Sequence, residues 1–282
     1  MLVEHKLIIH MQAIPIIPKS LAIWGLGQIG VAIKGPEGVV YIDPCLSDVV
    51  RELYGDWWER SYPPPLLPNE VINANFYLAS HEHQDHLDPI TARAIAIASP
   101  ESKFVISAWN LDILTQLGIA KERIIIPEAL EPMILPGTRI KLTVVPAAHY
   151  NKEFDKQKGY RYIGFLIEWN EVTFYHSGDT IIYPGYIEML HNLPTPDIAM
   201  VPVNGRDWFR ETGAGVIGNF LPSEVAQLAR DLEWDVIIPA HNDLFPNNML
   251  PMSQVVETLT TIAPRQKFKI LQPGELYYYT KQ

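Results

Sequence analysis

The segment from His81 to His86 carries five potential metal ligands in six positions, namely His81, Glu82, His83, Asp85 and His86. The sequence has nine histidines, and three of them fall in this segment. Imidazole and carboxylate groups together suit zinc, manganese or iron. Because side chains two residues apart in an extended segment point to the same side, we expect His81 and His83 to bind one ion. Asp85 and His86 follow in a predicted turn and are expected to face a second ion.

Three further candidate ligands follow apolar segments that are typical of buried strands. They are His149 after residues 142–148, Asp179 after residues 174–178 and His241 after residues 236–240. Sites in α/β proteins gather where strands open into loops. Each residue alone has an ordinary explanation, such as a satisfied polar histidine or a Gly-Asp turn. Likewise, the first segment alone could be a histidine-rich surface loop, but it directly follows a predicted strand over 75–80. Together the segments favour one metal centre.

The order of these residues resembles the signature of the metallo-β-lactamase superfamily. It reads Ser80-His81-Glu82-His83-Gln84-Asp85-His86, one later histidine, Ser177-Gly178-Asp179 and a final histidine. The resemblance extends from about Leu21 to the C-terminus. It implies a four-layer αββα sandwich with a dinuclear metal site at one edge. In that arrangement His81, His83 and His149 bind the first metal. Asp85, His86 and His241 bind the second metal, and Asp179 bridges the two.

Shorter motifs resemble the UlaG-like branch of that superfamily, the L-ascorbate-6-phosphate lactonases. The motifs are Trp24-x-Leu26-Gly27, His86-Leu87-Asp88, Tyr175-His176-Ser177-Gly178-Asp179, Asn204-Gly205-Arg206-Asp207 and Ile238-Pro239-Ala240-His241-Asn242-Asp243. This branch is associated with manganese and with the opening of a phosphorylated sugar lactone. The chain departs from the branch in being shorter at both ends and in having His149 where the branch has a carboxylate. The metal, manganese, zinc or iron, and the substrate therefore stay open.

The expected chemistry is hydrolysis by a metal-dependent enzyme. Two metals about 3.5–4 Å apart can share a water and make it a bridging hydroxide at neutral pH. The resemblance implies that this hydroxide attacks a small phosphorylated lactone or ester. Asp85 is also the expected proton carrier. Asp43 and His176 are expected to orient ligands without touching a metal, although a plain turn carboxylate is an equal alternative for Asp43.

Arg206 is the predicted substrate anchor, with Asn204 beside it. Arginine holds phosphate or carboxylate through two parallel hydrogen bonds. The alternative is a structural ion pair between Arg206 and Asp207 or Glu211. A second group of cations follows His149 and is interpreted as a basic rim or, with more support, as a solvated loop: Lys152, Lys156, Lys158 and Arg161.

Three other functions compete with the lactonase. The first is a phosphodiesterase of the same superfamily that acts on a small cyclic or lipid phosphodiester. The second is a redox protein with a diiron site, in which His83 would stand in place of a glutamate. The third is a non-enzymatic protein that keeps the fold without the metals, which the complete ligand set opposes.

Composition limits the class of protein and its partners. The 282 residues, 48% of them hydrophobic, suffice for one large core, and we expect a single domain over residues 1–282. A net charge of −10 opposes a nucleic-acid partner and leaves a small anionic substrate as the expected one. One cysteine excludes an internal disulfide and fits a cytoplasmic protein, and no apolar run is long enough to cross a membrane. Trp57-Trp58 and Trp208-Phe209 are interpreted as lid aromatics, core residues or contacts of a homo-oligomer.

The elements that must position these residues are short strands with helices between them. Strands are predicted over 7–9, 21–24, 31–34, 39–42, 75–80, 139–145, 162–168, 172–176, 197–203 and 235–239. A helix is predicted from Asp88, a good N-cap before Pro89, to Ala98. Two more helices are predicted around 225–232 and over 253–262. The pattern predicts an α/β (α+β) fold of two mixed sheets face to face with helices outside. The glycines of Gly25-x-Gly27-x-x-Gly30 are interpreted as turn residues, because a strand follows them.

Overall fold

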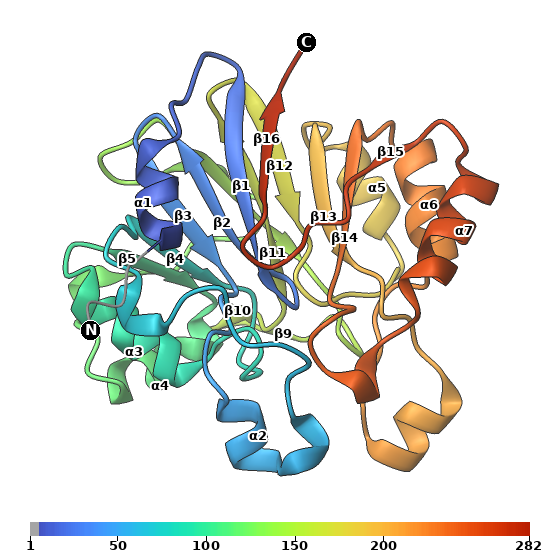
Figure 1. Ribbon diagram of the computed structural model, residues 1–282, viewed down its shortest axis with the longest axis horizontal. Helices are drawn as coiled ribbons and strands as arrows, with labels where there is room; N and C mark the ends of the chain where they lie inside the picture. Colours follow the sequence, from blue (N-terminus) through green and yellow to red (C-terminus); the bar gives the residue numbers. More distant parts are fainter. Residues whose placement is uncertain (1–5) are drawn as a thin grey trace.

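The computed structural model describes residues 6–282, which form two seven-stranded sheets packed face to face with helices outside (Figure 1). The first sheet has the order β16 (Leu276–Thr280), β1 (Ser20–Gly27), β2 (Gly30–Gly35), β3 (Gly38–Ile42), β4 (Phe76–Ala79), β5 (Lys103–Ile106) and β6 (Ile124–Ile125). The second has the order β15 (Lys267–Phe268), β14 (Val236–Ala240), β13 (Ile198–Pro202), β12 (Val172–His176), β11 (Ile163–Trp169), β8 (Lys141–Pro146) and β7 (Met133–Ile134). The predicted four-layer αββα sandwich is confirmed.

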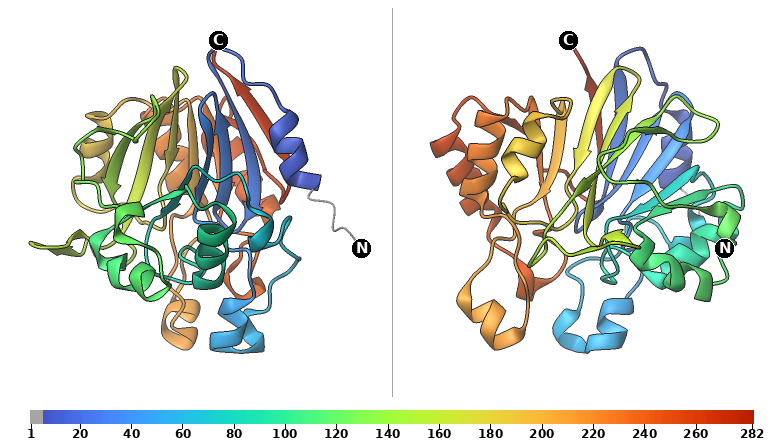
Figure 2. Two further views of the ribbon diagram at one scale, coloured as in Figure 1. Left: turned by 90° about the vertical axis from the view of Figure 1, so that its left-hand side faces the viewer. Right: turned by 180° about the vertical axis from the view of Figure 1, so that it is seen from behind.

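Helices cover the outer face of each sheet (Figure 2). The first sheet is covered by α1 (Lys6–Ala13), α3 (Pro89–Ala98) and α4 (Leu111–Gln116). The second is covered by α5 (Tyr186–His191), α6 (Pro222–Asp231) and α7 (Met252–Ile262). A short helix, α2 (Val49–Tyr54), continues into the 3-10 turn η1 (Asp56–Trp58) and protrudes at one end of the sandwich, beside the segment that contains the π-helical turn η5 (Arg210–Ala214). The remaining short elements are β9 (Phe154–Asp155), β10 (Gly159–Tyr160), η2 (Pro68–Glu70), η3 (Ala108–Asn110), η4 (Lys121–Arg123) and η6 (Pro246–Asn248).

The strands are apolar on both faces because each sheet is buried on both sides. In β1, Leu21 and Ile23 enter the core between the sheets, whereas Ala22 and Trp24 pack under the outer helices. This arrangement explains why the strands read as continuous apolar runs without clean alternation. Strands β1, β2 and β3 pair antiparallel, as tight glycine-containing turns allow, and β3, β4 and β5 pair in parallel across longer connections.

The strand predicted over residues 7–9 is wrong, because these residues belong to helix α1. Ile8 and Met11 are buried against the first sheet. The end of the helix is held by Lys34, whose Nζ donates to the carbonyls of Met11 and Ile14, each at 2.7 Å. A short apolar triplet cannot distinguish a strand from one buried helical turn.

The helix predicted after Asp88 is confirmed, and its N-cap fixes the segment that carries the histidines. The Asp88 carboxylate accepts from the backbone N–H of Ile90 at 2.9 Å and from that of Thr91 at 3.0 Å. It also accepts from the N–H of Ser47 at 2.9 Å, which ties α3 to the loop that follows β3. Asp88 is fully buried, so all of these donors would lose their partner if the carboxylate were removed.

We expect Asp88→Ala to lower the free energy of unfolding by about 2 kcal/mol, because a buried N-cap and a loop contact are lost together. Urea unfolding measures the change. The control is Asp112→Ala, an exposed carboxylate in the first turn of α4, which should change stability by less than about 0.5 kcal/mol. Equal effects of the two substitutions would contradict the capping role.

No helix among residues 6–282 has the length and apolar character needed to cross a bilayer.

Candidate metal centre

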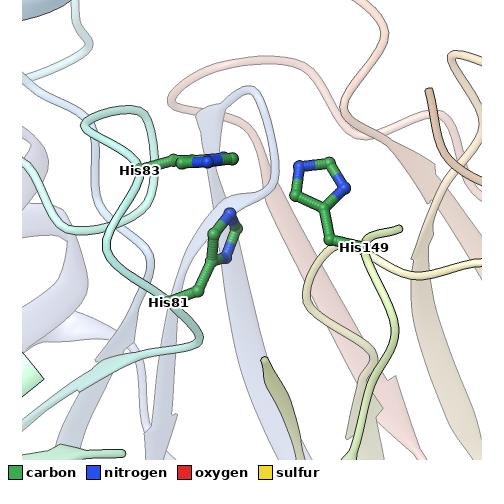
Figure 3. A group of neighbouring side chains, drawn as sticks. All are labelled: His81, His83 and His149. Carbon is green, nitrogen blue, oxygen red and sulfur yellow. The ribbon is translucent and has the colours of Figure 1, made fainter. Parts of the chain in front are cut away.

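The seven predicted ligands lie together at one end of the sandwich. They form three overlapping groups whose ligand atoms lie within 4.8 Å of one another: His81, His83 and His149; His81, His86 and Asp179; and Asp85, His86 and His241. Figure 3 shows the imidazoles of His81, His83 and His149 converging from two different segments of the chain. The overlap of the groups makes one continuous cluster.

The segment that carries the first histidines is a series of bends and turns, so the expected extended conformation is wrong. The backbone N–H of His86 donates to the carbonyl of His83 at 2.9 Å, which closes the turn. The rings of His81 and His83 still lie side by side, with centroids 4.5 Å apart. Glu82, between them, turns away and binds Arg161 instead, with its Oε1 2.6 Å from the guanidinium Nε.

The other ligands follow strands of the second sheet, as the sequence predicts. His149, Asp179 and His241 come after β8, β12 and β14 respectively. Gly178 precedes Asp179 with a φ of 59°, and a Cβ atom there would lie 2.6 Å from the carbonyl oxygen of Ile163. Glycine is therefore required where the backbone turns to present Asp179.

Several buried atoms of the cluster have no hydrogen-bond partner within residues 6–282. They include Nε2 of His81, Nδ1 of His149 and Oδ1 of Asp179. A buried polar atom without a partner costs about 1–3 kcal/mol, so native proteins seldom leave such atoms unpaired. A divalent cation would satisfy imidazole nitrogen and carboxylate oxygen together. The donor set thus fits the metal ions that the sequence implies.

Asp179 is the electrostatic centre of the cluster. Its Oδ2 lies 3.4 Å from Nε2 of His86, 3.5 Å from that of His149 and 3.3 Å from that of His241. Burial alone would raise the pKa of Asp179, but His241 and His86 outweigh burial and hold that pKa well below its usual range. Asp179 is therefore an ionised carboxylate throughout the physiological range, the form in which a carboxylate binds a metal ion.

Four of the predicted ligand histidines fall into two classes by the direction in which their pKa is shifted. Burial lowers the pKa of His149 to about 4 and places that of His81 well below its usual value, so both rings are neutral. Burial also acts on His86 and His241, but Asp179 and Asp85 outweigh it. The pKa of His241 is raised to about 9 and that of His86 well above its usual value. Without a metal, the two carboxylates favour the protonated form of these rings, and metal ions would compete with protons for the same nitrogens.

Asp43, predicted to orient a metal ligand, contacts the ring of His86 and the backbone of Ser80. Its Oδ2 lies 2.7 Å from Nδ1 of His86, which leaves Nε2 of that ring toward the cluster. Its Oδ1 accepts from the backbone N–H of Ser80 at 2.8 Å, directly before His81. His176 acts on the backbone instead: its Nδ1 accepts from the N–H of Gly178 at 3.2 Å, beside Asp179.

Gln28 is part of the site although the sequence did not single it out. Its Nε2 donates to Oδ2 of Asp85 at 2.8 Å and lies 3.2 Å from Nε2 of His241. Its carbonyl accepts from the backbone N–H of His241 at 2.7 Å. Gln28 sits at a φ of 57° in the β1–β2 turn, far from the other ligands in sequence. The only signal was its place beside Gly27 in a glycine-rich turn.

A cavity of about 330 Å³ opens over the cluster. Five of the predicted ligands lie on its surface: His83, Asp85, His149, Asp179 and His241. A volume of this size suits a small molecule. Asp85 is the more accessible of the two carboxylate ligands, with 18% of its side chain exposed against 3% for Asp179.

The predicted substrate anchors do not lie on this cavity. Arg206 forms a two-pronged ion pair with Glu224, at 2.8 and 2.6 Å, and donates to the carbonyl of Asn219 at 2.9 Å. The partner is thus neither of the two acids considered from the sequence, Asp207 and Glu211. Asn204 is buried, and its side chain binds those of Asn219 and Asn248. Substrate binding by Arg206 and Asn204 stays a prediction without a cavity contact to support it.

Three of the four cations after His149 have local partners. Lys152 lies over the rings of Tyr160 and Tyr183, at 5.8 and 5.1 Å from their centroids. Lys158 lies over Trp109 at 4.9 Å, and Arg161 binds Glu153 at 2.9 Å as well as Glu82. None of them appears on the cavity surface, within the part of the chain that the structure describes.

Comparison with known proteins agrees with the site geometry. Residues 39–242 match the family described as "Beta-lactamase superfamily domain". A curated relative from Pelotomaculum thermopropionicum, described as a UPF0173 metal-dependent hydrolase, is 28% identical over 261 residues, which are 89% of this chain and 96% of the relative.

Solved structures share the fold. Igni18, described as a metallo hydrolase from Ignicoccus hospitalis, has a TM-score of 0.66 at 20% identity and covers 93% of this chain and 100% of its own. An isothiocyanate hydrolase from Delia radicum gut bacteria has a TM-score of 0.69 at 15% identity, with 92% and 100% covered. At these identities the likeness concerns the fold.

We expect the protein to be stabilised by its metal. Removal with a chelator should lower the melting temperature, because ions that bind only the folded state stabilise it by mass action. Manganese or zinc should restore it. Elemental analysis should find up to two equivalents in the native protein and none in His81→Ala/Asp179→Ala. An unchanged melting curve after verified metal removal would rule out the stabilising role.

Asp43→Asn should weaken metal affinity by roughly 10–100-fold, because the carboxylate no longer orients His86 or favours its ligand form. Titration with a metal-sensitive dye measures the affinity. Asp48→Asn provides the control, since its carboxylate is 58% exposed and contacts the site nowhere in the described structure. If the two variants bound metal equally well, Asp43 would be a turn carboxylate, as the alternative from the sequence holds.

Proposed function

The chain belongs to the beta-lactamase superfamily, and from that premise we propose that it is a metal-dependent hydrolase of a small ester or lactone. One observation carries the proposal. Seven imidazole and carboxylate side chains converge at one end of the sandwich, five of them on the surface of a cavity, with buried nitrogen and oxygen atoms that have no other partner in the described structure. The description of the curated relatives as metal-dependent hydrolases supports the same activity.

We propose a separate set of ligands for each of two metal ions. His81, His83 and His149 would hold one ion, Asp85, His86 and His241 a second, and Asp179 both. When bound, two divalent ions would lower the pKa of water to yield a nucleophile, and would polarise the substrate's carbonyl through its oxygen so that the carbon is attacked more readily. The protein supplies the fixed ligand frame and a sheltered cavity.

Asp85 is the residue best placed to carry a proton. It lies on the cavity surface, and its Oδ2 accepts from Gln28 at 2.8 Å. Burial alone would raise the pKa of Asp85, but His86 and His241 lower it far below its usual range, so the carboxylate is ionised. A proton taken from the nucleophile at Asp85 could pass to the leaving oxygen within the same cavity.

The narrower assignment, a UlaG-like lactonase that opens a phosphorylated sugar lactone, rests on the short motifs in the sequence. It needs a cation for the phosphate, and the predicted cation, Arg206, is already paired with Glu224. The geometry therefore supports hydrolysis at the metal cluster more directly than it supports recognition of a phosphate.

We expect hydrolysis of p-nitrophenyl acetate or γ-butyrolactone to disappear after chelation and return with manganese or zinc. His81→Ala/Asp179→Ala should lose at least about a thousandfold in kcat/KM, as expected when the groups that activate the nucleophile are removed. His191→Ala, at an exposed histidine of α5, is the control and should keep full activity. Metal-independent turnover would refute the proposal, and turnover of bis(p-nitrophenyl) phosphate alone would instead indicate a phosphodiesterase.

The same assay, extended to a phosphorylated lactone, tests the role of Arg206. Because Arg206 pairs with Glu224, Arg206→Met should change KM for a phosphorylated lactone and a neutral lactone by the same factor. A much larger rise in KM for the phosphorylated lactone would show that Arg206 anchors the substrate, as the sequence suggests.

A further inference from the structure

The walls of the cavity above the metal ligands are apolar. Helix α2 and turn η1 contribute Val50, Tyr54 and Trp58. The π-helical turn contributes Ala214 at its end, and the segment after it contributes Val216 and Ile217. Figures 1 and 2 show these two segments as lobes that project from the same end of the sandwich. Beyond the ligands, the polar side chains on the cavity surface are the uncharged Gln84 and Asn248 and the Tyr54 hydroxyl.

No lysine or arginine of residues 6–282 lies on the cavity surface. The nearby Arg206 is paired with Glu224. Arg210 lies behind Asn248, where it donates to Oδ1 of Asn248 at 3.1 Å and to the carbonyl of Asn204 at 2.9 Å. A phosphate carried into this cavity would lose its water without gaining a cation from the walls, which is costly.

The walls are held in place by contacts of their own side chains and backbone. The Tyr54 hydroxyl donates to Oε1 of Gln84 at 2.9 Å, and the ring of Trp58 meets that of Phe245 edge to face at 5.4 Å. On the other lobe, Gly218 follows Ile217 and packs on the backbone of Gly205, so closely that a Cβ would lie 2.1 Å from that carbonyl oxygen. The apolar surface is thus preformed, which favours binding of an apolar group without a cost of ordering.

We infer that this cavity binds an uncharged substrate whose apolar acyl or aryl group lies against Trp58, Val216 and Ile217 while its scissile carbonyl reaches the metal ligands. The inference rests on the proposed hydrolase function and names its substrate class. Small pockets with apolar walls and a few polar groups at one end select by the shape and length of the apolar part.

The same lobes carry apolar side chains outward from the cavity. Leu53 and Trp57 are 58% and 66% exposed on one lobe, and Trp208 and Phe209 are 69% and 78% exposed on the other. None of these four side chains lies on the cavity surface, so the gain from a longer acyl chain should end once the cavity is filled.

Straight-chain hydroxamic acids test the inference, because the hydroxamate binds metal ions and the alkyl chain reports on the walls. Calorimetric titration of the manganese- or zinc-loaded protein, from acetohydroxamic to octanohydroxamic acid, should show Kd falling by about threefold per added methylene until the chain fills the cavity. A hexanohydroxamic acid with a terminal phosphate should bind more weakly than its uncharged counterpart.

Two variants test where the alkyl chain of the hydroxamic acid lies. Ile217→Ser should flatten the dependence of Kd on chain length, and Ala214→Trp, at an exposed position of the wall, should weaken only the longer chains. Ile97→Ser changes an isoleucine that is 71% exposed on α3 and should keep the slope of the native protein.

The outcomes separate this inference from the proposed function. Acetohydroxamic acid that binds with no gain from longer chains, or a phosphate-bearing chain that binds more tightly than the uncharged one, would overturn the apolar assignment alone. Absence of metal from the protein, or absence of binding by every hydroxamate, would overturn the proposed function as well.

Discussion

The site depends on the burial of one carboxylate, Asp179, among three imidazole nitrogens. Its Oδ2 lies within 3.5 Å of His86, His149 and His241, three side chains from three separate segments. An isolated buried carboxylate would be very costly, so the fold tolerates it only where positive charge balances it. The carboxylates raise the pKa of His86 and His241, which favours positive charge there in the metal-free protein, and divalent ions would supply that charge in the loaded one.

Strands of both sheets bring these side chains together. Strand β4 of the first sheet delivers the histidine-rich turn, and β8, β12 and β14 of the second deliver His149, Asp179 and His241. Because the two sheets pack face to face, these strand ends meet at one end of the sandwich. Asp43, just after β3, fixes the histidine-rich turn in place, since it binds both the Ser80 backbone and the ring of His86.

Much of this could be predicted from the sequence, because the information was local. Each ligand follows an apolar strand within a few residues, and the cap at Asp88 is a local signal too. The features that the sequence did not predict depend on long-range contacts, or lie in a segment whose sequence allows two conformations. The triplet at 7–9 forms a helix because tertiary packing of Ile8 decides between two structures that its sequence allows. Gln28 and the Arg206–Glu224 pair were invisible because their partners lie up to 213 residues away and no periodic pattern marks such contacts. Reading Arg206 as a substrate anchor assumed that its guanidinium was free.

The charge of the cluster itself bears on which substrates are productive. Two bound divalent ions would bring four positive charges to a cavity whose ligand carboxylates, Asp85 and Asp179, bring two negative ones. An anionic group entering a cavity without wall cations would be drawn to the metals, since these would be its only strong positive charges. It would then occupy the position that the scissile carbonyl needs. A neutral substrate avoids this competition, because its most electron-rich atom is the carbonyl oxygen that must be polarised, while apolar walls hold the remainder. The absence of arginine and lysine of residues 6–282 from the walls, and the excess positive charge expected at the floor, thus favour the same class of substrate.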